Sequence, residues 1–195
     1  QSFSDGENFQ VLEDDIIGMT GDVLEGNFKL FIGKKVYLDK IDQMMNKLGV
    51  PASRKYLTAD TTARVVLTQA EMESGVALVD FGGGCTSVSI YYGNIMRHYS
   101  SIPFGGGNIT EDIKNECQIS SHLAENIKLA YGACLPEKLQ SMSEKIIHIR
   151  SNSADPDSQL PVKYLSEIIT CRVEEILMAI FYEIEKSGFA DKLRS

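Results

Sequence analysis

The sequence predicts an α/β fold in which a small antiparallel sheet packs against helices. Apolar and polar residues alternate on both sides of a glycine turn between Gly75 and Asn94, which indicates a β-hairpin. The pair Gly-Asn then leads into a third strand at Ile95 to Ile102. A long helix at about Val162 to Ser187 carries a continuous apolar stripe, which must be buried against a large surface. We expect that surface to be the hairpin sheet.

The first residues of the chain predict a small α+β unit. Strands are expected at Phe9 to Leu12, Val23 to Glu25 and Asn27 to Ile32. The period then becomes helical, and one apolar stripe contains Tyr37, Ile41, Met44, Met45 and Leu48. Gly49 ends this helix, with Pro51 just beyond it. The two adjacent methionines fit either a binding groove or core filling, and core filling is the commoner use.

The segment before the hairpin predicts one helix. Thr61 or Thr62 is a candidate N-cap, and the helix is expected to extend through Glu73. Gly75 ends it and leads into the first strand of the hairpin.

The turn of the hairpin has the composition of a phosphate site. An apolar strand ends on a single carboxylate, Asp80, and Gly82, Gly83 and Gly84 follow at once. Glycines let backbone N–H groups approach an anion closely. Asp80 cannot itself bind phosphate, so its role there would be to hold a metal ion or to orient a water molecule. The alternative is a tight hairpin with a buried acid at its mouth, and the residues alone leave both open.

A second glycine cluster follows the third strand. Gly105, Gly106 and Gly107 precede Thr110, the expected N-cap of the next helix, whose first turn would hold two acids, Glu111 and Asp112. A glycine-rich loop before a helix can hold an anion, but acids in the first turn favour plain capping.

The last third of the chain alternates helix, strand and helix. A helix is expected at His122 to Tyr131, where Glu125 and Lys128 are three residues apart and indicate a surface ion pair. A strand at Lys145 to Arg150 and a polar loop at Ser151 to Gln159 precede the long final helix.

The overall composition excludes several classes of function. The 195 residues carry a formal net charge of −8, which argues against nucleic acid as a partner and against broad contact with anionic lipid. No apolar run reaches the ~18 residues of a membrane span, and no signal or lipidation motif is visible. Four scattered cysteines and three isolated histidines show no metal-ligand spacing and fit a reduced, cytoplasmic protein.

The hairpin motif resembles the second phosphate loop of the actin-like ATPases, which have a ribonuclease H-like fold. The motif is Asp80-Phe-Gly-Gly-Gly-Cys-Thr86, followed by a Val/Ile strand, a Gly-Asn turn and a third strand. Within that superfamily the chain is most similar to the bacterial cell-division family FtsA. The similar segments cover nearly the whole chain in order: Ile17 to Gly21 with Val23 to Glu25, Gly75 to Tyr92, Ile109 to Ile113 with Ala124 to Gly132, and Glu185 to Gly188.

The resemblance implies an incomplete actin-like module. It assigns residues 1–56 to a 1C-like α+β subdomain, 57–74 to a returning helix of subdomain 1A, 75–104 to the start of subdomain 2A, and 105–195 mainly to subdomain 2B. The family's first phosphate loop is expected before Gln1, and its adenosine loop and amphipathic membrane helix after Ser195. We therefore expect the chain alone to bind ATP weakly or not at all.

The resemblance also implies a site for ATP and Mg²⁺. Asp80 matches the acid that handles Mg²⁺ indirectly or orients the attacking water. The matching cofactor-binding positions are Gly82, Gly83, Gly84, Cys85 and Thr86 in the phosphate cradle, Gly105 and Gly106 near the nucleotide, and Glu125 and Lys128 in the Glu-x-x-Lys pair that turns toward ribose and adenine.

Two positions depart from the family pattern. Cys85 stands where Thr is usual, and Ser87 where Asp is usual. The missing second acid bears on hydrolysis more than on binding, because a backbone N–H cradle does not depend on either side chain. The full-length protein is therefore expected to be at most a weak ATPase.

The function implied by the resemblance is that of a cell-division adaptor. Such a protein binds ATP, polymerises and tethers the FtsZ ring to the inner face of the cytoplasmic membrane, as a peripheral cytoplasmic protein. The C-terminal peptide of FtsZ is expected on subdomain 2B, where Arg172 would meet a carboxylate, with Lys163 or Lys128 as lesser candidates. The alternative for Arg172 is a surface ion pair with Glu175.

Further partners and alternatives follow from the same resemblance. Other division proteins are expected at the 1C-like subdomain, and the membrane only through the helix beyond this chain. The alternatives are a pilus-assembly actin-like protein and a sugar or acetate kinase. A kinase needs a hydroxyl-activating acid and a substrate pocket, and the sequence shows neither.

Overall fold

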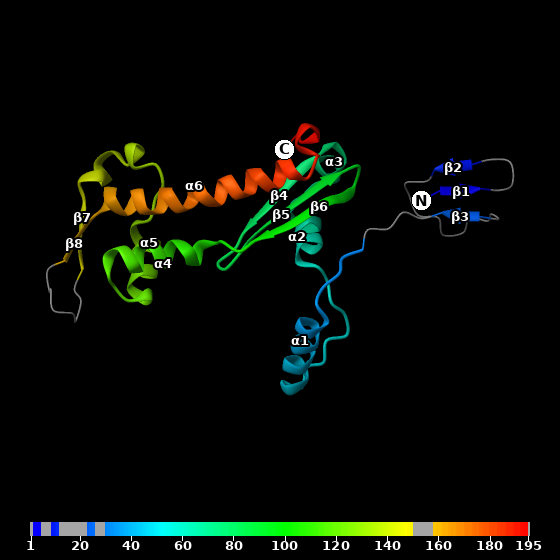
Figure 1. The fold of residues 1–195 in the computed structure, drawn as a ribbon, viewed down its shortest axis with the longest axis horizontal. Helices are drawn as coiled ribbons and strands as arrows, with labels where there is room; N and C mark the ends of the chain where they lie inside the picture. Colours follow the sequence, from blue (N-terminus) through cyan, green and yellow to red (C-terminus); the bar gives the residue numbers. More distant parts are fainter. Residues whose placement is uncertain (1, 5–8, 12–22, 26–29, 150–157, 195) are drawn as a thin grey trace. The chain divides into compact units, whose positions relative to one another are not determined.

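The chain forms two compact units, residues 1–55 and 56–195 (Figure 1). The structure, a computed structural model, describes residues 2–4, 9–11, 23–25, 30–149 and 158–194. In the first unit, β1 (Ser2–Ser4) pairs antiparallel with both β2 (Phe9–Val11) and β3 (Val23–Glu25). The strands predicted near residues 9–12 and 23–25 are confirmed. The strand predicted at residues 27–32 is not, because 30–32 are not in a strand, and 27–29 and the family-like segment 17–21 lie outside the described residues.

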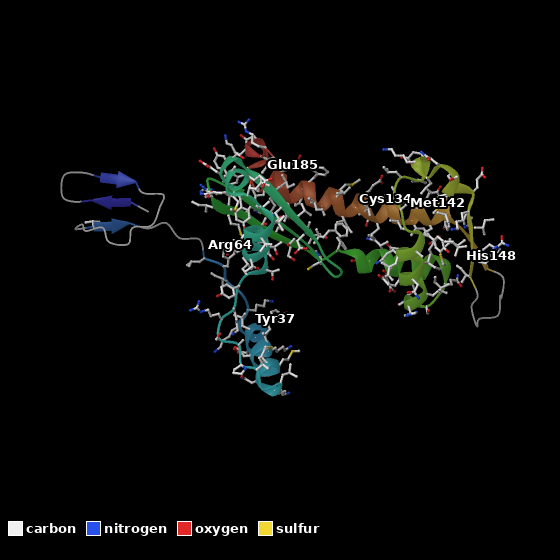
Figure 2. All side chains as sticks on the ribbon, turned by 180° about the vertical axis from the view of Figure 1, so that it is seen from behind. Tyr37, Arg64, Cys134, Met142, His148 and Glu185 are labelled. Carbon is white, nitrogen blue, oxygen red and sulfur yellow. The ribbon has the colours of Figure 1, made fainter. Side chains whose placement is uncertain are left out.

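The helix of the first unit is α1 (Lys35–Lys47), and its apolar stripe is uncovered. None of its residues is buried, and Tyr37 and Met44 are 59% and 65% exposed. Figure 2 labels Tyr37 on this helix. The prediction that Met44 fills a core is therefore wrong. The predicted helix end is confirmed, because Gly49 adopts a φ of 72° directly after the last turn.

The second unit contains the predicted central sheet. Strands β4 (Val76–Phe81), β5 (Thr86–Tyr92) and β6 (Ile95–Ile102) pair antiparallel in the order β4-β5-β6. The register places Asp80 opposite Ser87 and Phe81 opposite Thr86, at the end of the hairpin that carries the glycine turn.

Two helices, not one, precede this sheet. They are α2 (Thr58–Val66) and α3 (Gln69–Ser74), separated at Leu67 and Thr68. The Thr68 hydroxyl accepts a hydrogen bond from the Glu71 N–H, and the Thr68 N–H donates to the Glu71 carboxylate at 2.8 Å. This capping box starts a new helix, so the prediction of a continuous helix from Thr61 or Thr62 through Glu73 is wrong.

The rest of the second unit is a helical layer with a small hairpin. Its elements are α4 (Gly106–Cys117), α5 (Ser121–Tyr131), the 3₁₀ turns η1 (Pro136–Lys138) and η2 (Gln140–Glu144), strands β7 (Ile146–Ile149) and β8 (Ser158–Pro161), helix α6 (Val162–Lys186) and the 3₁₀ turn η3 (Ala190–Lys192).

Helix α6 packs into two separate cores. Its first half buries Leu165 and Ile169 among residues of α4, α5, β7 and β8. Its second half buries Ile176 and Ile180 with Val88 and Ile102 of the sheet. The expected packing on the sheet is thus confirmed for the second half only. One rigid helix therefore joins the layer that contains α4 to the sheet that carries the glycine turn (Figure 1).

Candidate functional site

The two glycine clusters of the second unit lie side by side. The N–H of Gly106 donates to the Gly82 carbonyl at 2.9 Å, and the N–H of Gly107 donates to the Gly83 carbonyl at 2.7 Å. A Cβ at Gly105 would lie 2.3 Å from the Gly82 oxygen, and one at Gly107 would lie 2.9 Å from the Gly83 oxygen. Glycine is needed here because any side chain would push the hairpin turn away from the start of α4.

The start of α4 differs from the sequence prediction. The helix begins at Gly106, and the Gly105 N–H donates to the Asn108 side chain at 2.9 Å. Thr110 is buried inside the helix and is not its N-cap, so Glu111 and Asp112 lie outside the first turn. The first two N–H groups of α4 already bind carbonyls of the hairpin turn, so they are not available to an anion.

The hairpin turn itself offers free N–H groups. Gly83, Gly84 and Cys85 are exposed, and no described residue accepts a hydrogen bond from their N–H groups. Thr86 is fully buried, and its hydroxyl donates to the Phe104 carbonyl at 2.8 Å, which fixes the base of the turn. Consecutive unpaired N–H groups in one turn can bind an anion such as phosphate.

Asp80 is an exposed, free carboxylate beside this turn. It lies one residue before the end of β4, opposite Ser87, and within the described part of the chain its side chain makes no hydrogen bond or ion pair. The alternative of a buried acid at the mouth of the hairpin is therefore excluded. No group of three potential metal ligands occurs among the described residues, so a cation at Asp80 would take its other ligands from phosphate oxygens and water.

The Glu125–Lys128 pair of α5 faces the start of α4. Lys128 Nζ lies 2.8 Å from Glu125 Oε2, which confirms the ion pair expected from the spacing. The same ammonium donates to the Thr110 hydroxyl at 2.7 Å and to the Gly106 carbonyl at 3.0 Å. The Thr110 hydroxyl in turn donates to the Glu125 carboxylate. Hydrogen bonds from Lys128 and then from Thr110 lower the pKa of Glu125, so its side chain is anionic near neutral pH.

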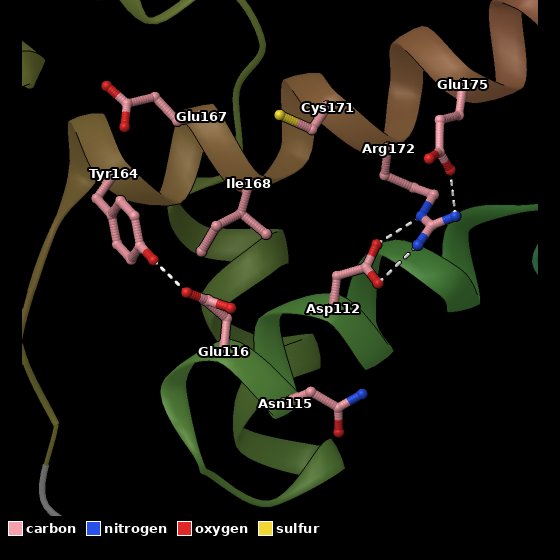
Figure 3. Close-up of a pocket in the computed structure, with 9 residues that line it drawn as sticks. All are labelled: Asp112, Asn115, Glu116, Tyr164, Glu167, Ile168, Cys171, Arg172 and Glu175. Carbon is pink, nitrogen blue, oxygen red and sulfur yellow. Dashed lines mark hydrogen bonds and ion pairs between the residues drawn. The ribbon is translucent and has the colours of Figure 1, made fainter.

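A second charged cluster lines an open groove between α4 and α6 (Figure 3). The groove has a volume of about 490 Å³. Its lining residues are Asp112, Asn115, Glu116, Tyr164, Glu167, Ile168, Cys171, Arg172 and Glu175. Arg172 Nε and Nη2 bind the two Asp112 oxygens at 2.6 and 2.9 Å, and Nη1 donates to Glu175. The Tyr164 hydroxyl donates to Glu116.

The groove is more acidic than the sequence suggested. Arg172 is the one cation among its lining residues, against four carboxylates. The ion pair with Glu175 that the sequence offered as the alternative is present, and Asp112 adds a bidentate contact. Lys163 and Lys128, the lesser candidates for partner binding, do not line the groove.

The structure gives two residues contacts that the sequence does not predict. The sequence predicts Thr110 as an N-cap, but its side chain joins the Glu125–Lys128 pair. It predicts Asp112 as a first-turn acid, but Asp112 binds Arg172, which is 60 residues away in the chain. The spacing of Asp112 and Glu116, which puts both on one face of α4, was a local signal for the groove.

Comparison with solved structures defines the fold class. The chain resembles MreB5 of Spiroplasma citri bound to ADP, with a TM-score of 0.65 and 16% identity, over 78% of this chain and 48% of that one. The same protein bound to AMPPNP gives a TM-score of 0.64 over the same shares. The fold is thus that of an actin-like protein, in part, and the predicted fold class is confirmed.

Comparison of sequences defines the family within this class. The family model for cell division protein FtsA matches residues 77–190. The FtsA of Neisseria meningitidis serogroup B is 31% identical over 89% of this chain and 41% of its own length. The FtsA of Pseudomonas aeruginosa is 31% identical over 90% and 42%, and that of Borreliella burgdorferi 29% identical over 91% and 43%. The chain belongs to the FtsA family, and it spans about two fifths of the length of these relatives.

The family match argues against the pilus-assembly and kinase alternatives. Among the helices that the structure describes, none combines the length and the apolar character that crossing a bilayer requires.

Proposed function

We propose that the protein is an actin-like cell-division adaptor that binds ATP, polymerises and tethers an FtsZ ring to the inner face of the cytoplasmic membrane. The observation that carries the nucleotide part is the hairpin turn. It presents the free N–H groups of Gly83, Gly84 and Cys85 next to the free carboxylate of Asp80. An anion cradle beside an unpaired acid suits a phosphate chain with its divalent cation.

The proposed roles follow from these positions. The exposed N–H groups of the turn bind the terminal phosphates. Gly105 and Gly107 let the turn and α4 meet closely, and the Gly106 N–H holds the Gly82 carbonyl. Asp80 holds Mg²⁺ through water or orients the attacking water, and the ion supplies charge neutralisation at the phosphates. The hydrogen bond from the Thr86 hydroxyl to the Phe104 carbonyl fixes the base of the turn.

Hydrolysis is proposed to be weak. Ser87 lies opposite Asp80 in the register, where the family pattern has a second acid. A serine hydroxyl cannot take up a proton from water as a carboxylate does, so a single acid remains for the chemistry. The nucleotide would then act mainly as a ligand that favours the polymer.

We also propose that the groove between α4 and α6 binds the C-terminal peptide of FtsZ. Arg172 carries five N–H donors and uses three of them on Asp112 and Glu175, so two remain for a peptide carboxylate. Because the groove also contains four carboxylates, the peptide must carry a positive charge as well as the acid that binds Arg172. Lys163 is exposed at the start of α6 and is a secondary contact.

Other division proteins would bind the unit of residues 1–55, and the membrane would be reached by a helix outside this chain.

The peptide assignment is tested by fluorescence anisotropy with a labelled FtsZ tail peptide. Arg172→Glu is expected to weaken binding by roughly 1–3 kcal/mol, the range for a lost hydrogen bond to a charged group. Lys163→Glu is the matched control, because it makes the same charge change outside the groove lining and is expected to cost less. Equal affinities of wild type and Arg172→Glu would remove Arg172 from the site, and no binding by wild type would contradict the partner.

The nucleotide assignment is tested by calorimetry with Mg-ATP on the full-length protein. Binding by wild type is expected to weaken when the turn is altered by Gly84→Pro, which removes one free N–H from the cradle. Gly33→Pro is the matched control, because it makes the same change at a glycine of the first unit where an added Cβ would meet no atom within 4 Å. Absence of ATP binding by the full-length protein would contradict the proposal.

A further inference from the structure

Two peptide units of the hairpin turn have hydrogen-bonding groups on both sides. The Gly82 carbonyl accepts from the Gly106 N–H at 2.9 Å, and the Gly83 carbonyl accepts from the Gly107 N–H at 2.7 Å. The N–H groups of the same two peptide units are those of Gly83 and Gly84, for which no described residue is an acceptor. A trans peptide unit is rigid and planar, so its N–H and C=O point in opposite directions. An anion bound by the turn and the start of α4 therefore share two rigid groups.

The first turn of α4 depends on these bonds. Gly106 and Gly107 are the first two residues of the helix, and glycine is the least favourable helix residue after proline. The first N–H groups of an α-helix have no acceptor within the helix, and here the hairpin turn supplies the acceptors. Without them, two flexible glycines would leave this helix end to fray. The first turn of α4 thus has two arrangements, one bound to the hairpin turn and one frayed.

The segment on either side of this helix start orients Arg172. Phe104 precedes the glycines, and its carbonyl accepts from the Thr86 hydroxyl at 2.8 Å. Its ring faces the Arg172 guanidinium, with 5.9 Å between the ring centroid and Cζ. Asp112 follows the glycines on α4 and binds Nε and Nη2 of the same guanidinium (Figure 3). The orientation of Arg172 in the groove therefore depends on how the start of α4 is held.

We infer that a phosphate group bound at the hairpin turn strengthens peptide binding in the groove between α4 and α6. This inference rests on the proposed binding of ATP and of the FtsZ tail peptide, and it adds that the two sites are coupled. When the N–H of a peptide unit donates to phosphate, the unit is polarised and its carbonyl becomes a stronger acceptor. The Gly82 and Gly83 carbonyls then hold the first turn of α4 more firmly, and the bound arrangement is favoured.

The effect at the groove is one of preorganisation. With the start of α4 held, Phe104 and Asp112 keep the Arg172 guanidinium in one orientation. The conformational freedom that Arg172 would lose on binding a carboxylate is then already lost before the peptide arrives. Coupling between two binding sites is reciprocal, so the peptide should raise the affinity for the nucleotide by the same factor.

The test measures the affinity of the full-length protein for a labelled FtsZ tail peptide by fluorescence anisotropy, with and without saturating Mg-ATP. Protein concentrations are kept where pelleting detects no polymer, so that assembly does not change the affinity. Wild type should bind the peptide at least about fivefold more tightly with the nucleotide, the lower end of typical coupling between sites. Equal affinities with the nucleotide bound would overturn the inference.

Two substitutions of Gly106 form a matched pair. Proline removes the N–H that donates to Gly82, and it is tolerated at the first position of a helix. Alanine keeps the N–H, and its Cβ would lie at ordinary distances, 3.8 Å from Lys128 Nζ and 3.9 Å from the Gly82 oxygen. Gly106→Pro should lose most of the effect of Mg-ATP on peptide affinity, and Gly106→Ala should keep it. Full retention of the effect in Gly106→Pro would overturn the inference.

Hydrogen exchange followed by mass spectrometry tests the step at α4 itself. In wild type, a fragment that contains Gly106 and Gly107 should exchange about fivefold more slowly with Mg-ATP bound, and this measurement does not require Gly106→Pro to fold. Unchanged exchange in the nucleotide complex would contradict the coupling. Calorimetry distinguishes that result from failure of the proposed function, because a wild type that does not bind Mg-ATP would contradict the proposed function and the inference together.

Discussion

Helix α4 takes part in two charged clusters that are built in opposite ways. In the cluster around Thr110, Lys128 has three protein acceptors and Glu125 keeps one oxygen free. In the groove, Asp112 has both oxygens occupied by Arg172, and Arg172 keeps unused donors. The first cluster therefore presents an acceptor to its surroundings and the second presents donors.

This difference shows that an ion pair alone does not reveal which partner faces a ligand. The spacing of Glu125 and Lys128 in the sequence assigns no direction to the pair, and neither does Arg172 beside Glu175. The direction comes from a third residue on α4, Thr110 in one case and Asp112 in the other, which takes up the capacity of one partner.

The largest loss of stability is expected when α4 is separated from the hairpin turn. Gly105→Ala would place a Cβ 2.3 Å from the Gly82 carbonyl, and backbone on both sides cannot yield cheaply. We expect a loss of about 1–3 kcal/mol in the free energy of unfolding, the usual cost of overpacking. Urea denaturation followed by circular dichroism measures it.

The matched control for this variant is Gly83→Ala. A Cβ at Gly83 would meet no atom within 4 Å, so its effect on stability should be far smaller. If the two alanine variants were equally stable, the close approach of turn and helix would not matter for the fold.

A smaller loss of stability is expected when Arg172 loses its bidentate partner Asp112. The side chains of Asp112 and Arg172 are 28% and 24% exposed, so Asp112→Asn leaves a partly buried guanidinium without its bidentate partner. We expect a loss of about 1–2 kcal/mol, between the values for exposed and buried pairs. Thermal or chemical denaturation measures the change.

Glu111→Gln on the same helix is the control. Glu111 pairs with Lys114 at the surface, so its loss should cost under about 0.5 kcal/mol. If Asp112→Asn were no more destabilising than this control, the Asp112–Arg172 contact would contribute no more to the free energy of unfolding than a surface ion pair does.

The features that could be predicted from the sequence are the local ones. The hairpin follows from period-two alternation and from turn residues within Gly75 to Asn94. The glycine turn and Asp80 could be singled out because an acid and three glycines stand together in the chain. The long final helix was equally visible, because its apolar stripe continues for several turns.

The features that were missed depend on tertiary contacts. Glycines cost about 1 kcal/mol each inside a helix, so the sequence predicts that this helix starts at Thr110, after the glycine cluster. The structure starts it at Gly106 because the hairpin turn supplies carbonyl partners there. The Asp112–Arg172 contact joins residues 60 apart in the chain, and no local pattern encodes it. The break before α3 could have been predicted from the sequence, because Thr68 and Glu71 have the spacing of a capping box.

A third prediction contrasts the paired acid Asp112 with the unpaired acid Asp80. Asp80→Asn should change the free energy of unfolding by no more than about 0.5 kcal/mol, because Asp80 is exposed and has no partner in the described part of the chain. Nucleotide-dependent polymerisation of the full-length protein, measured by pelleting, should nevertheless fall. A large drop in melting temperature with an unchanged response to ATP would mean that Asp80 is structural.

The smallest expected effect concerns the protonation of Glu125, and it tests the first cluster directly. The hydrogen bonds from Lys128 and Thr110 hold the pKa of Glu125 below its ordinary value. A carboxylate with a lowered pKa in the folded state stabilises the fold above its unfolded pKa of about 4.3, and this contribution is lost as the pH falls through the folded pKa. Because the Glu125 side chain is 44% exposed, solvent screens the interaction and the stability effect is small.

A carboxyl-carbon NMR titration should therefore show the pKa of Glu125 moving up toward its ordinary value in Thr110→Val. Glu71, whose pKa is lowered by Thr68 in the capping box before α3, is the internal control and should titrate unchanged. An unchanged Glu125 titration in Thr110→Val would show that Lys128 alone holds the carboxylate, and that Thr110 does not belong to the cluster.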